Sequence, residues 1–450
     1  MSFDPLILSR HSDVREHYLS IMAAALVAVD PDQAVRGRLH RTEHELNIDG
    51  QTYDLRRFRR ILVVGAGKAG APMVRAVEEL LGTAISEGLV VVKTGHAALT
   101  ARVEIVEAAH PIPSQAGLDA GKRILTLLES AGADDLVLVL LSGGGSALLE
   151  ASAALTLADL QATTDALLAC GAAINEINCL RKHLSLIKGG QLARAASPAT
   201  LVTLVLSDVV GSPLDVIASG PTVPDRSTWA DVWDVVTRYD LASRLPAAVT
   251  ARLQAGVRGE LPDTPKPGDP IFANAQTVIV GDNRVAAQAA CQRAAELGYQ
   301  PLLLTTFMEG EAREVAKLAV ALAKEVRSNG RPVAPPACLV LGGETTVTLG
   351  AQPGYGGRNQ ELALAAALAL EGMPGVTVAA LATDGSDGPT DSAGGLVDDE
   401  TVATGRSAGL DAAAALRRHD AYPFLRATGD LLLTGPTQTN VNDLVFVWVE

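Results

Sequence analysis

The sequence predicts an α/β protein with two domains, each built on a largely parallel sheet that is flanked by helices. The chain has 450 residues, which is more than one hydrophobic core usually organises, so two domains are expected. Short runs of Val, Leu and Ile alternate with longer amphipathic segments, which is the pattern of βαβ units. Glycines are abundant, and several clusters of them directly follow an apolar run. These clusters are the most informative feature of the composition.

The first half of the chain predicts a lead helix over about residues 11–30, followed by alternating strands and helices. The run 135–141 is the most continuously apolar and is typical of a buried strand. The expected strands are 61–64, 89–92, 103–106, 135–141 and 201–206, and the expected helices are 115–128 and 157–170.

A proline-rich segment at 261–270 has the composition of a linker, so we place the domain boundary between residues 265 and 266. The alternation of strands and helices then starts again. Strands are expected at 278–280, 302–305, 339–341 and 376–381, helices at 284–297, 311–327 and 359–370, and closing antiparallel strands at 431–433 and 444–449.

Composition excludes some classes of protein. A net charge of −14 argues against nucleic acid as the main partner, because a phosphate backbone needs a broad basic face. The four cysteines show no CxxC spacing, so neither a zinc site nor a redox pair is predicted. No basic segment followed by an apolar run marks a signal peptide, and the run 21–29 is too short to span a bilayer. We therefore expect a cytoplasmic protein without a membrane partner.

The first glycine cluster, GAGKAG at 65–70, follows a strand and precedes a helix. Glycine allows close backbone approach, and a helix start offers free N–H groups to an anion. The GxGxxG pattern also occurs in dinucleotide sites, but those place an acidic residue at the end of the next strand, where this chain has Lys93. Lys68 in the turn suits a phosphoryl or carboxylate group. The alternative is a solvated lysine at a helix start.

The second cluster follows the strand 135–141 and is not a Walker A loop, because GxxxxGK[ST] is absent. Three consecutive glycines are entropically costly, which favours a close approach of backbone to a ligand over a simple tight turn. We assign this loop to nucleotide binding, with its residues Ser142, Gly143, Gly144, Gly145 and Ser146.

Carboxylates follow two other predicted strands. Asp208 lies just after the strand 201–206, where it could hold a metal, accept a proton from a substrate hydroxyl, or cap a helix. The loop 383–391 carries Asp384 and Asp387 among small residues, and hard oxygen ligands of this kind suit Mg²⁺. A solvated acidic turn is the alternative for this loop.

Two groups of cations stand out in an acidic chain. Arg358 follows two glycines at the start of a predicted helix, where the helix dipole disfavours a cation and a bound anion would relieve the conflict. Local pairing with Glu361 is the alternative. The segment 181–183 reads Arg-Lys-His, and we assign Lys182 to the cofactor site, with a charged helix surface as the alternative.

In this order, the motifs resemble those of the two-domain glycerate 2-kinases whose C-terminal part is the MOFRL domain. The resemblance covers about residues 20–225 and 272–450. It is carried by residues 65–70, 109–113, 141–147, 178–190, 207–208, 218–222, 342–344, 356–361, 383–391, 434–437 and 439–443.

The resemblance implies an N-terminal Rossmann-like glycerate kinase domain at 1–265, a C-terminal MOFRL-type α/β domain at 266–450, and an active site in the cleft between them. It implies ATP-dependent, Mg²⁺-assisted phosphorylation of D-glycerate at the 2-hydroxyl, which gives 2-phosphoglycerate and ADP. The family's lysine and arginine correspond to Lys68 and Arg358, which we expect to stabilise charge. Asp208 is the third expected catalytic residue, and Asp384 and Asp387 are the expected metal ligands. The partners would be small molecules, D-glycerate and ATP, and the protein a monomer or homodimer.

Two other classes of function remain open from the residues alone. The turn 65–70 also fits an NAD(P)H-dependent reductase of hydroxypyruvate or tartronate semialdehyde, although the missing ribose carboxylate counts against it. A non-catalytic module that senses sugars or nucleotides would use the same anion-binding loops.

Overall fold

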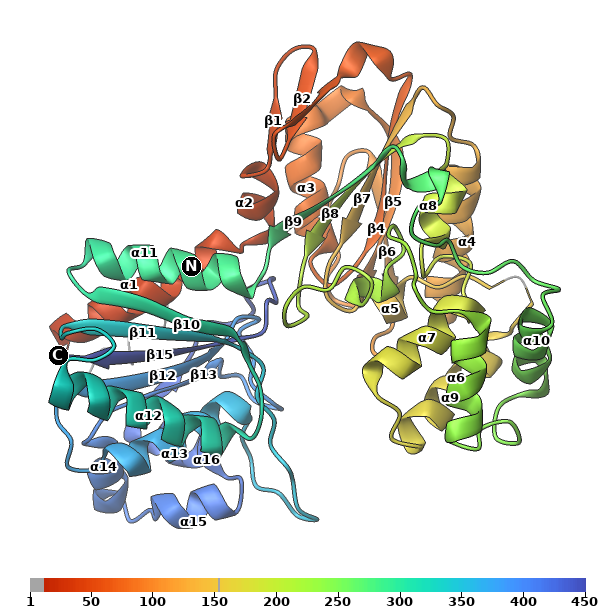
Figure 1. Cartoon of the computed structure of the whole chain (residues 1–450). Helices are drawn as coiled ribbons and strands as arrows, with labels where there is room; N and C mark the ends of the chain where they lie inside the picture. Colours follow the sequence, from red (N-terminus) through yellow and green to blue (C-terminus); the bar gives the residue numbers. More distant parts are fainter. Residues whose placement is uncertain (1–11, 153) are drawn as a thin grey trace. The chain divides into compact units, whose positions relative to one another are not determined.

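The computed structural model describes residues 12–152 and 154–450. These form two compact units, which Figure 1 shows in sequence colours. The N-terminal unit spans residues 31–280, and the C-terminal unit combines residues 281–450 with residues 12–30. This division differs from the single boundary expected at 265/266. The lead helix α1 (Ser12–Ala28) belongs to the C-terminal unit, and the strand after the proline-rich segment belongs to the N-terminal unit.

The N-terminal unit is built on a six-stranded sheet in the order β6-β5-β4-β7-β8-β9. The four pairs from β6 to β8 are parallel, as the sequence predicts. The central strands β4 and β7 are buried on both faces, which is why their sequences are continuous apolar runs. The strands are β4 (Arg60–Ala66), β5 (Ile85–Lys93), β6 (Val103–Ala108), β7 (Asp135–Leu141), β8 (Thr200–Leu206) and β9 (Ala275–Gly281).

Helices cover both faces of this sheet (Figure 1). Helix α3 (Gly70–Leu81) lies on one face, and α4 (Gln115–Glu129) and α8 (Gln191–Ala196) pack on the other. A layer of four further helices has its own apolar core, and the sequence predicted only the first of them: α6 (Leu157–Ala169), α7 (Ile174–Leu184), α9 (Trp229–Arg238) and α10 (Ala247–Val257). Smaller elements are α2 (Pro31–Arg36), α5 (Gly145–Leu148) and an antiparallel sheet of β1 (Leu39–Arg41), β2 (Glu45–Ile48) and β3 (Gln51–Asp54).

The C-terminal unit contains a six-stranded sheet in the order β10-β11-β15-β12-β13-β14. Only β10 and β11 pair in parallel, and the other four pairs are antiparallel. The expectation of a largely parallel sheet is therefore wrong for this unit. Strand β15 is antiparallel, as expected for residues 444–449, but it inserts between β11 and β12; an apolar run predicts burial but not which strands it pairs with. The strands are β10 (Gln300–Met308), β11 (Ala337–Gly343), β12 (Val376–Ala382), β13 (Gly394–Val397), β14 (Leu431–Leu432) and β15 (Asp443–Val449).

Helix α1 packs beside α11 (Asn283–Glu296) on one face of this sheet, where Tyr18 stacks on Trp448 with ring centroids 4.1 Å apart. The opposite face is covered by α12 (Ala312–Asn329), α13 (Arg358–Leu370) and α16 (Ala421–Thr428), with α14 (Thr401–Ser407) and α15 (Ala412–Arg417) outside them. Among the described residues, no helix is long and apolar enough to cross a membrane.

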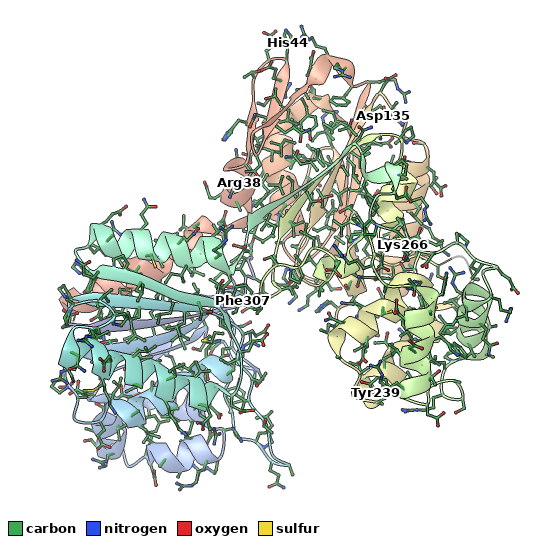
Figure 2. The ribbon with its side chains drawn as sticks, in the orientation of Figure 1. Arg38, His44, Asp135, Tyr239, Lys266 and Phe307 are labelled. Carbon is green, nitrogen blue, oxygen red and sulfur yellow. The ribbon has the colours of Figure 1, made fainter. Side chains whose placement is uncertain are left out.

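The two ends of the parallel sheet differ in chemistry. Asp135, labelled in Figure 2, begins β7 at the amino end, where its buried carboxylate accepts a 2.7 Å hydrogen bond from Arg60 Nη2. This ion pair is structural. The glycine clusters predicted from the sequence lie at the opposite, carboxyl ends of β4 and β7, which is where open α/β sheets place ligands.

Candidate functional site

The two glycine-rich turns of the N-terminal unit pack against each other. The backbone N–H of Lys68 donates to the carbonyl of Gly143 (2.9 Å), and the N–H of Ala69 donates to Ser142 Oγ (3.0 Å). Gly67 has φ +147°, and a Cβ there would lie 2.0 Å from Ser142 Oγ. Neighbouring parallel strands therefore bring the two predicted motifs into one loop cluster.

The triple glycine is needed because charged and polar side chains approach its backbone on two sides. A Cβ on Gly143 would lie 2.2 Å from Asp208 Oδ2. A Cβ on Gly144, which has φ +83°, would lie 2.9 Å from His110 Cδ2 and 3.6 Å from Lys68 Cγ. The loop thus has a carboxylate on one side and an imidazole with a lysine on the other. Three of the sequence-predicted features, Lys68, Asp208 and the loop, lie together.

A group of basic side chains surrounds this loop. Burial lowers the pKa of His110 to about 4, helped by the charges of Lys68 and Lys93 and by His96. The Nδ1 atom of His96 lies 3.1 Å from the carbonyl oxygen of Lys68. Lys68 is half-buried, and within residues 12–152 and 154–450 its ammonium has neither a hydrogen bond nor an ion pair. Cations that lack carboxylate partners favour the binding of an anion.

Sequence reasoning did not assign His110, His96 or Lys93 to the site. A signal was present, because Lys93 ends β5, His96 follows it, and His110 follows the end of the neighbouring strand β6. All three therefore lie at the same sheet edge as Lys68.

Ser146 belongs to a short hydrogen-bonded chain. Its Oγ lies 2.7 Å from Ser219 Oγ, and Ser219 donates to Asn178 Oδ1 (3.1 Å). Ala218 and Ser219 have φ of +49° and +60°, an uncommon conformation for residues other than glycine. Ala218 packs so closely on Gly145 that a Cβ there would lie 2.9 Å away. Backbone strain of this kind is often found at functional sites.

Lys182, assigned to the cofactor site from the sequence, is held elsewhere. Its Nζ lies 3.2 Å from Asp225 Oδ1 and 3.4 Å from Asp215 Oδ2, and the side chains of Lys182 and Asp225 are only 6% and 1% exposed. The neighbouring His183 also has a structural contact, because its Nε2 lies 3.0 Å from Asp263 Oδ1. The geometry therefore gives Lys182 a structural role, and a role in cofactor binding stays a prediction that this pairing does not favour.

Arg358, in the C-terminal unit, is the first residue of α13. Its Nε and Nη2 atoms donate to the carboxylate of Asp443 at 2.5 and 3.1 Å, and its Nη1 lies 2.8 Å from Glu344 Oε1. Burial opposes the charge, but the hydrogen bond and charge of Asp443 outweigh it and raise the pKa of Arg358. The carboxylates of Asp443 and Glu344 thus offset the unfavourable position of a cation at a helix start, for which the sequence analysis proposed a bound anion. Glu361 is not the partner, because it pairs with Arg313 and His419.

The two expected metal ligands differ. The buried carboxylate of Asp387 accepts the backbone N–H groups of Asn359 (3.1 Å) and Gln360 (2.8 Å), so it caps the start of α13. Burial raises its pKa to about 6. Asp384 is half-buried, and its Oδ1 accepts the N–H of Ser386 (3.0 Å). Across the described ranges, no three His, Cys, Asp or Glu side chains converge as a metal site. Mg²⁺ often takes one or two carboxylates besides phosphate oxygens, a requirement that Asp384 fits and Asp387 does not.

The cavities among the described residues of the N-terminal unit include a larger and a smaller one. The larger, about 440 Å³, lies at the amino ends of the strands between Phe58, Asp134, Thr200 and Gln276, and contains none of the predicted residues. The smaller, about 20 Å³, is lined by Ser146 of the glycine loop and by Arg181.

Comparison with known proteins places the chain in a family. The family described as "Domain of unknown function (DUF4147)" matches residues 17–254, and the MOFRL family matches residues 337–443. A glycerate 2-kinase of Pyrococcus horikoshii is 39% identical, over 97% of this chain and 98% of its own length. A protein of Agrobacterium vitis named "Putative hydroxypyruvate reductase" is 46% identical over 86% of each chain.

A solved structure, of the glycerate kinase of Thermotoga maritima, has the same fold. It superimposes with a TM-score of 0.87 at 40% identity, over 97% of this chain and 99% of its own. Whole-length identity to named relatives, both family matches and this structural agreement lead to one conclusion: the chain belongs to the glycerate 2-kinase family that joins a DUF4147 domain to a MOFRL domain.

Proposed function

We propose that this protein transfers the γ-phosphoryl group of ATP to the 2-hydroxyl of D-glycerate, giving 2-phosphoglycerate and ADP. Membership in a family whose relatives are named glycerate 2-kinase and glycerate kinase supports glycerate phosphorylation. The observation that carries the proposal is the edge of the parallel sheet, where a triple glycine lies beside the carboxylate of Asp208 and beside Lys68, which has no ion pair among the described residues. Phosphoryl transfer requires mainly positioning and neutralisation of charge, and this edge supplies both.

Each group has a defined task in the proposed reaction. The glycine loop lets phosphate oxygens approach backbone N–H groups, because no Cβ intervenes. Asp208 accepts the proton of the attacking hydroxyl as its oxygen forms a bond to the γ-phosphorus. The bond between that phosphorus and the bridging oxygen breaks, and ADP leaves with the electron pair. Lys68 stabilises the negative charge on the transferred group.

The C-terminal unit contributes two further candidates. An anionic substrate could replace the contact between Arg358 and Glu344, whose side chain is 43% exposed, while Asp443 keeps the guanidinium in place. Asp384 would hold Mg²⁺, which supplies neutralisation of charge on the phosphates when bound.

ADP release measured by a coupled assay tests the proposal. We expect release that requires both D-glycerate and Mg²⁺ and that is lost in Lys68→Ala. The absence of glycerate-dependent ADP from the folded protein would refute it.

A reductase is the second candidate, because one relative carries that name and the turn 65–70 fits GxGxxG. The end of β5 carries Lys93 in place of the carboxylate that binds ribose. We therefore expect no loss of NADH or NADPH absorbance when hydroxypyruvate is added, and a clear decrease would favour the reductase.

A further inference from the structure

The small cavity beside the glycine loop has the size of a terminal functional group. Its volume is about 20 Å³, above the roughly 10–15 Å³ that one water molecule needs. Ser146 and Ala147 line it from the loop side, and Arg181 lines it from α7. A group as large as an adenine ring does not fit, whereas a group of carboxylate size does.

Arg181 is the cation of this cavity that has no direct partner among the described residues. It is half-buried, and burial lowers its pKa, although the nearby charge of Glu150 acts in the opposite direction; its guanidinium has no hydrogen bond or ion pair there. The carboxylate of Glu150 also lines the cavity, but Ser185 donates to it (2.6 Å) and the fully buried ammonium of Lys188 pairs with it. The direct contacts of Glu150 are therefore with Ser185 and Lys188, and it acts on Arg181 only through its charge. A partly desolvated cation without a partner is unfavourable, and an incoming anion removes that cost.

The hydroxyl groups around the cavity cannot supply this anion with donors. Thr163 and Thr164 donate their protons to carbonyls of their own helix, at 2.7 and 3.0 Å. Because the hydroxyl of Ser219 donates to Asn178, its oxygen accepts the proton of Ser146. Ser146 can therefore only accept a hydrogen bond from a ligand. The cavity offers a guanidinium for an anion and, beside it, an acceptor for a hydroxyl.

We propose that Arg181 binds the carboxylate of a small hydroxy acid and that Ser146 accepts a hydrogen bond from the hydroxyl of the same molecule. A carboxylate is an acceptor-only group, and its two oxygens match the planar donor fork of a guanidinium. The inference rests on the proposed function, because it makes this cavity the binding site for the carboxylate of the phosphoryl acceptor. It assigns Arg181 to substrate selection rather than to the transfer of the phosphoryl group.

The test compares Arg181→Gln and Arg181→Lys with Arg252→Gln. Arg252 is a matched control, because it is also half-buried in the N-terminal unit with a pKa lowered by burial, but it does not line the cavity. We expect Arg181→Gln to raise the KM for D-glycerate about tenfold or more, which corresponds to about 1.4 kcal/mol. The lysine variant should be intermediate, since it keeps the charge but loses the fork. The KM for ATP should be unchanged in all three variants.

A second readout separates recognition from structural support. Calorimetry without ATP compares D-glycerate with glyceramide, its neutral amide. The wild-type protein should prefer the acid by about tenfold or more, and Arg181→Gln should abolish this preference. If Arg181 only supports the structure, Arg181→Gln should lower the affinity for both ligands equally. If Arg181→Gln proves unfolded by thermal melting, the lysine variant decides the question.

The outcomes distinguish this inference from the proposed function. An unchanged preference for the acid in the folded glutamine variant overturns the inference, as does a rise in the KM for ATP instead of that for D-glycerate. Glycerate binding that depends on Arg181 but brings no ADP release would support the inference and refute the kinase. Failure of the wild-type protein to bind D-glycerate at all would overturn the inference.

Discussion

The cations of this protein occur in two kinds of environment. Lys68 lies at a glycine-lined strand end without a carboxylate partner in the described chain, next to other basic side chains. Lys182 and Arg358 carry the same charge but are held by carboxylates at 3.2 Å and 2.5 Å. Residue type and a nearby glycine therefore do not identify a ligand-binding cation. The combination of a glycine-lined strand end with a cation that has no partner among the described residues is the feature that favours anion binding.

The largest effect on stability is expected for Lys182→Met. The substitution leaves the buried Asp225 without its cation, so we expect the free energy of unfolding to fall by about 3–5 kcal/mol. Urea unfolding measures this loss. Arg123→Met is the control, since it removes an exposed pair with Glu104 and should change stability by less than about 1 kcal/mol. Equal effects in the two variants would show that the Lys182 pair is not structural.

Lys68→Ala should lower catalytic activity and leave stability almost unchanged, whereas Lys182→Met should mainly lower stability. We expect kcat to fall about 10²–10³-fold, the typical result of removing one group that stabilises transition-state charge. The melting temperature should change little, because the ammonium has no partner to lose among the described residues. Turnover close to wild type in the folded variant would contradict the role of Lys68.

Arg358→Ala should lower both stability and catalytic activity. We expect a loss of about 2 kcal/mol in stability, less than for a fully buried pair because 34% of the side chain is exposed. The double variant Arg358→Ala/Asp443→Asn should regain stability, since no buried charge is left unpaired, while kcat stays low. If kcat recovers together with stability, Arg358 is structural and its catalytic assignment fails.

The smallest effect concerns pH. In the folded protein the pKa of His110 is about 4, below the ordinary value of about 6.5, so the unfolded chain binds the proton more readily. Stability should therefore fall as pH drops from about 6.5 towards 4. Melting temperatures across this window should show a shallower slope for His110→Asn than for wild type. If the melting temperature depends on pH equally in both proteins, His110 does not have the lowered pKa that its place among the basic side chains predicts.

The sequence predicted well which motifs lie at the carboxyl edge of the parallel sheet, because each of these motifs is contiguous in the chain. The apolar runs and glycine turns that predict β4 and β7 are contiguous, and parallel strands must end at the same edge. Lys68, Asp208 and the glycine loop could therefore be grouped from the sequence alone. The antiparallel direction of the closing strand was also predicted and is confirmed by β15, but its central position between β11 and β12 was not, because an apolar run does not specify which strands it pairs with.

The pairing of cations could not be predicted for a related reason. Asp225 lies 43 residues after Lys182, and Asp443 lies 85 residues after Arg358. These contacts arise only when distant segments fold together. The contact between Asp387 and the start of α13 also joins segments that are distant in the sequence. The sequence predicts Asp387 as a metal ligand, but in the fold its carboxylate accepts hydrogen bonds from backbone N–H groups.

Phosphorus NMR of the product formed from ATP and D-glycerate tests the central claim most directly, with Lys68→Ala run beside the wild-type protein. We expect the wild-type protein to produce ADP and a phosphomonoester at the 2-position of glycerate, and the variant to leave ATP unchanged on the same timescale. An unchanged ATP spectrum with the folded wild-type protein, or equal product from the two proteins, would contradict the account.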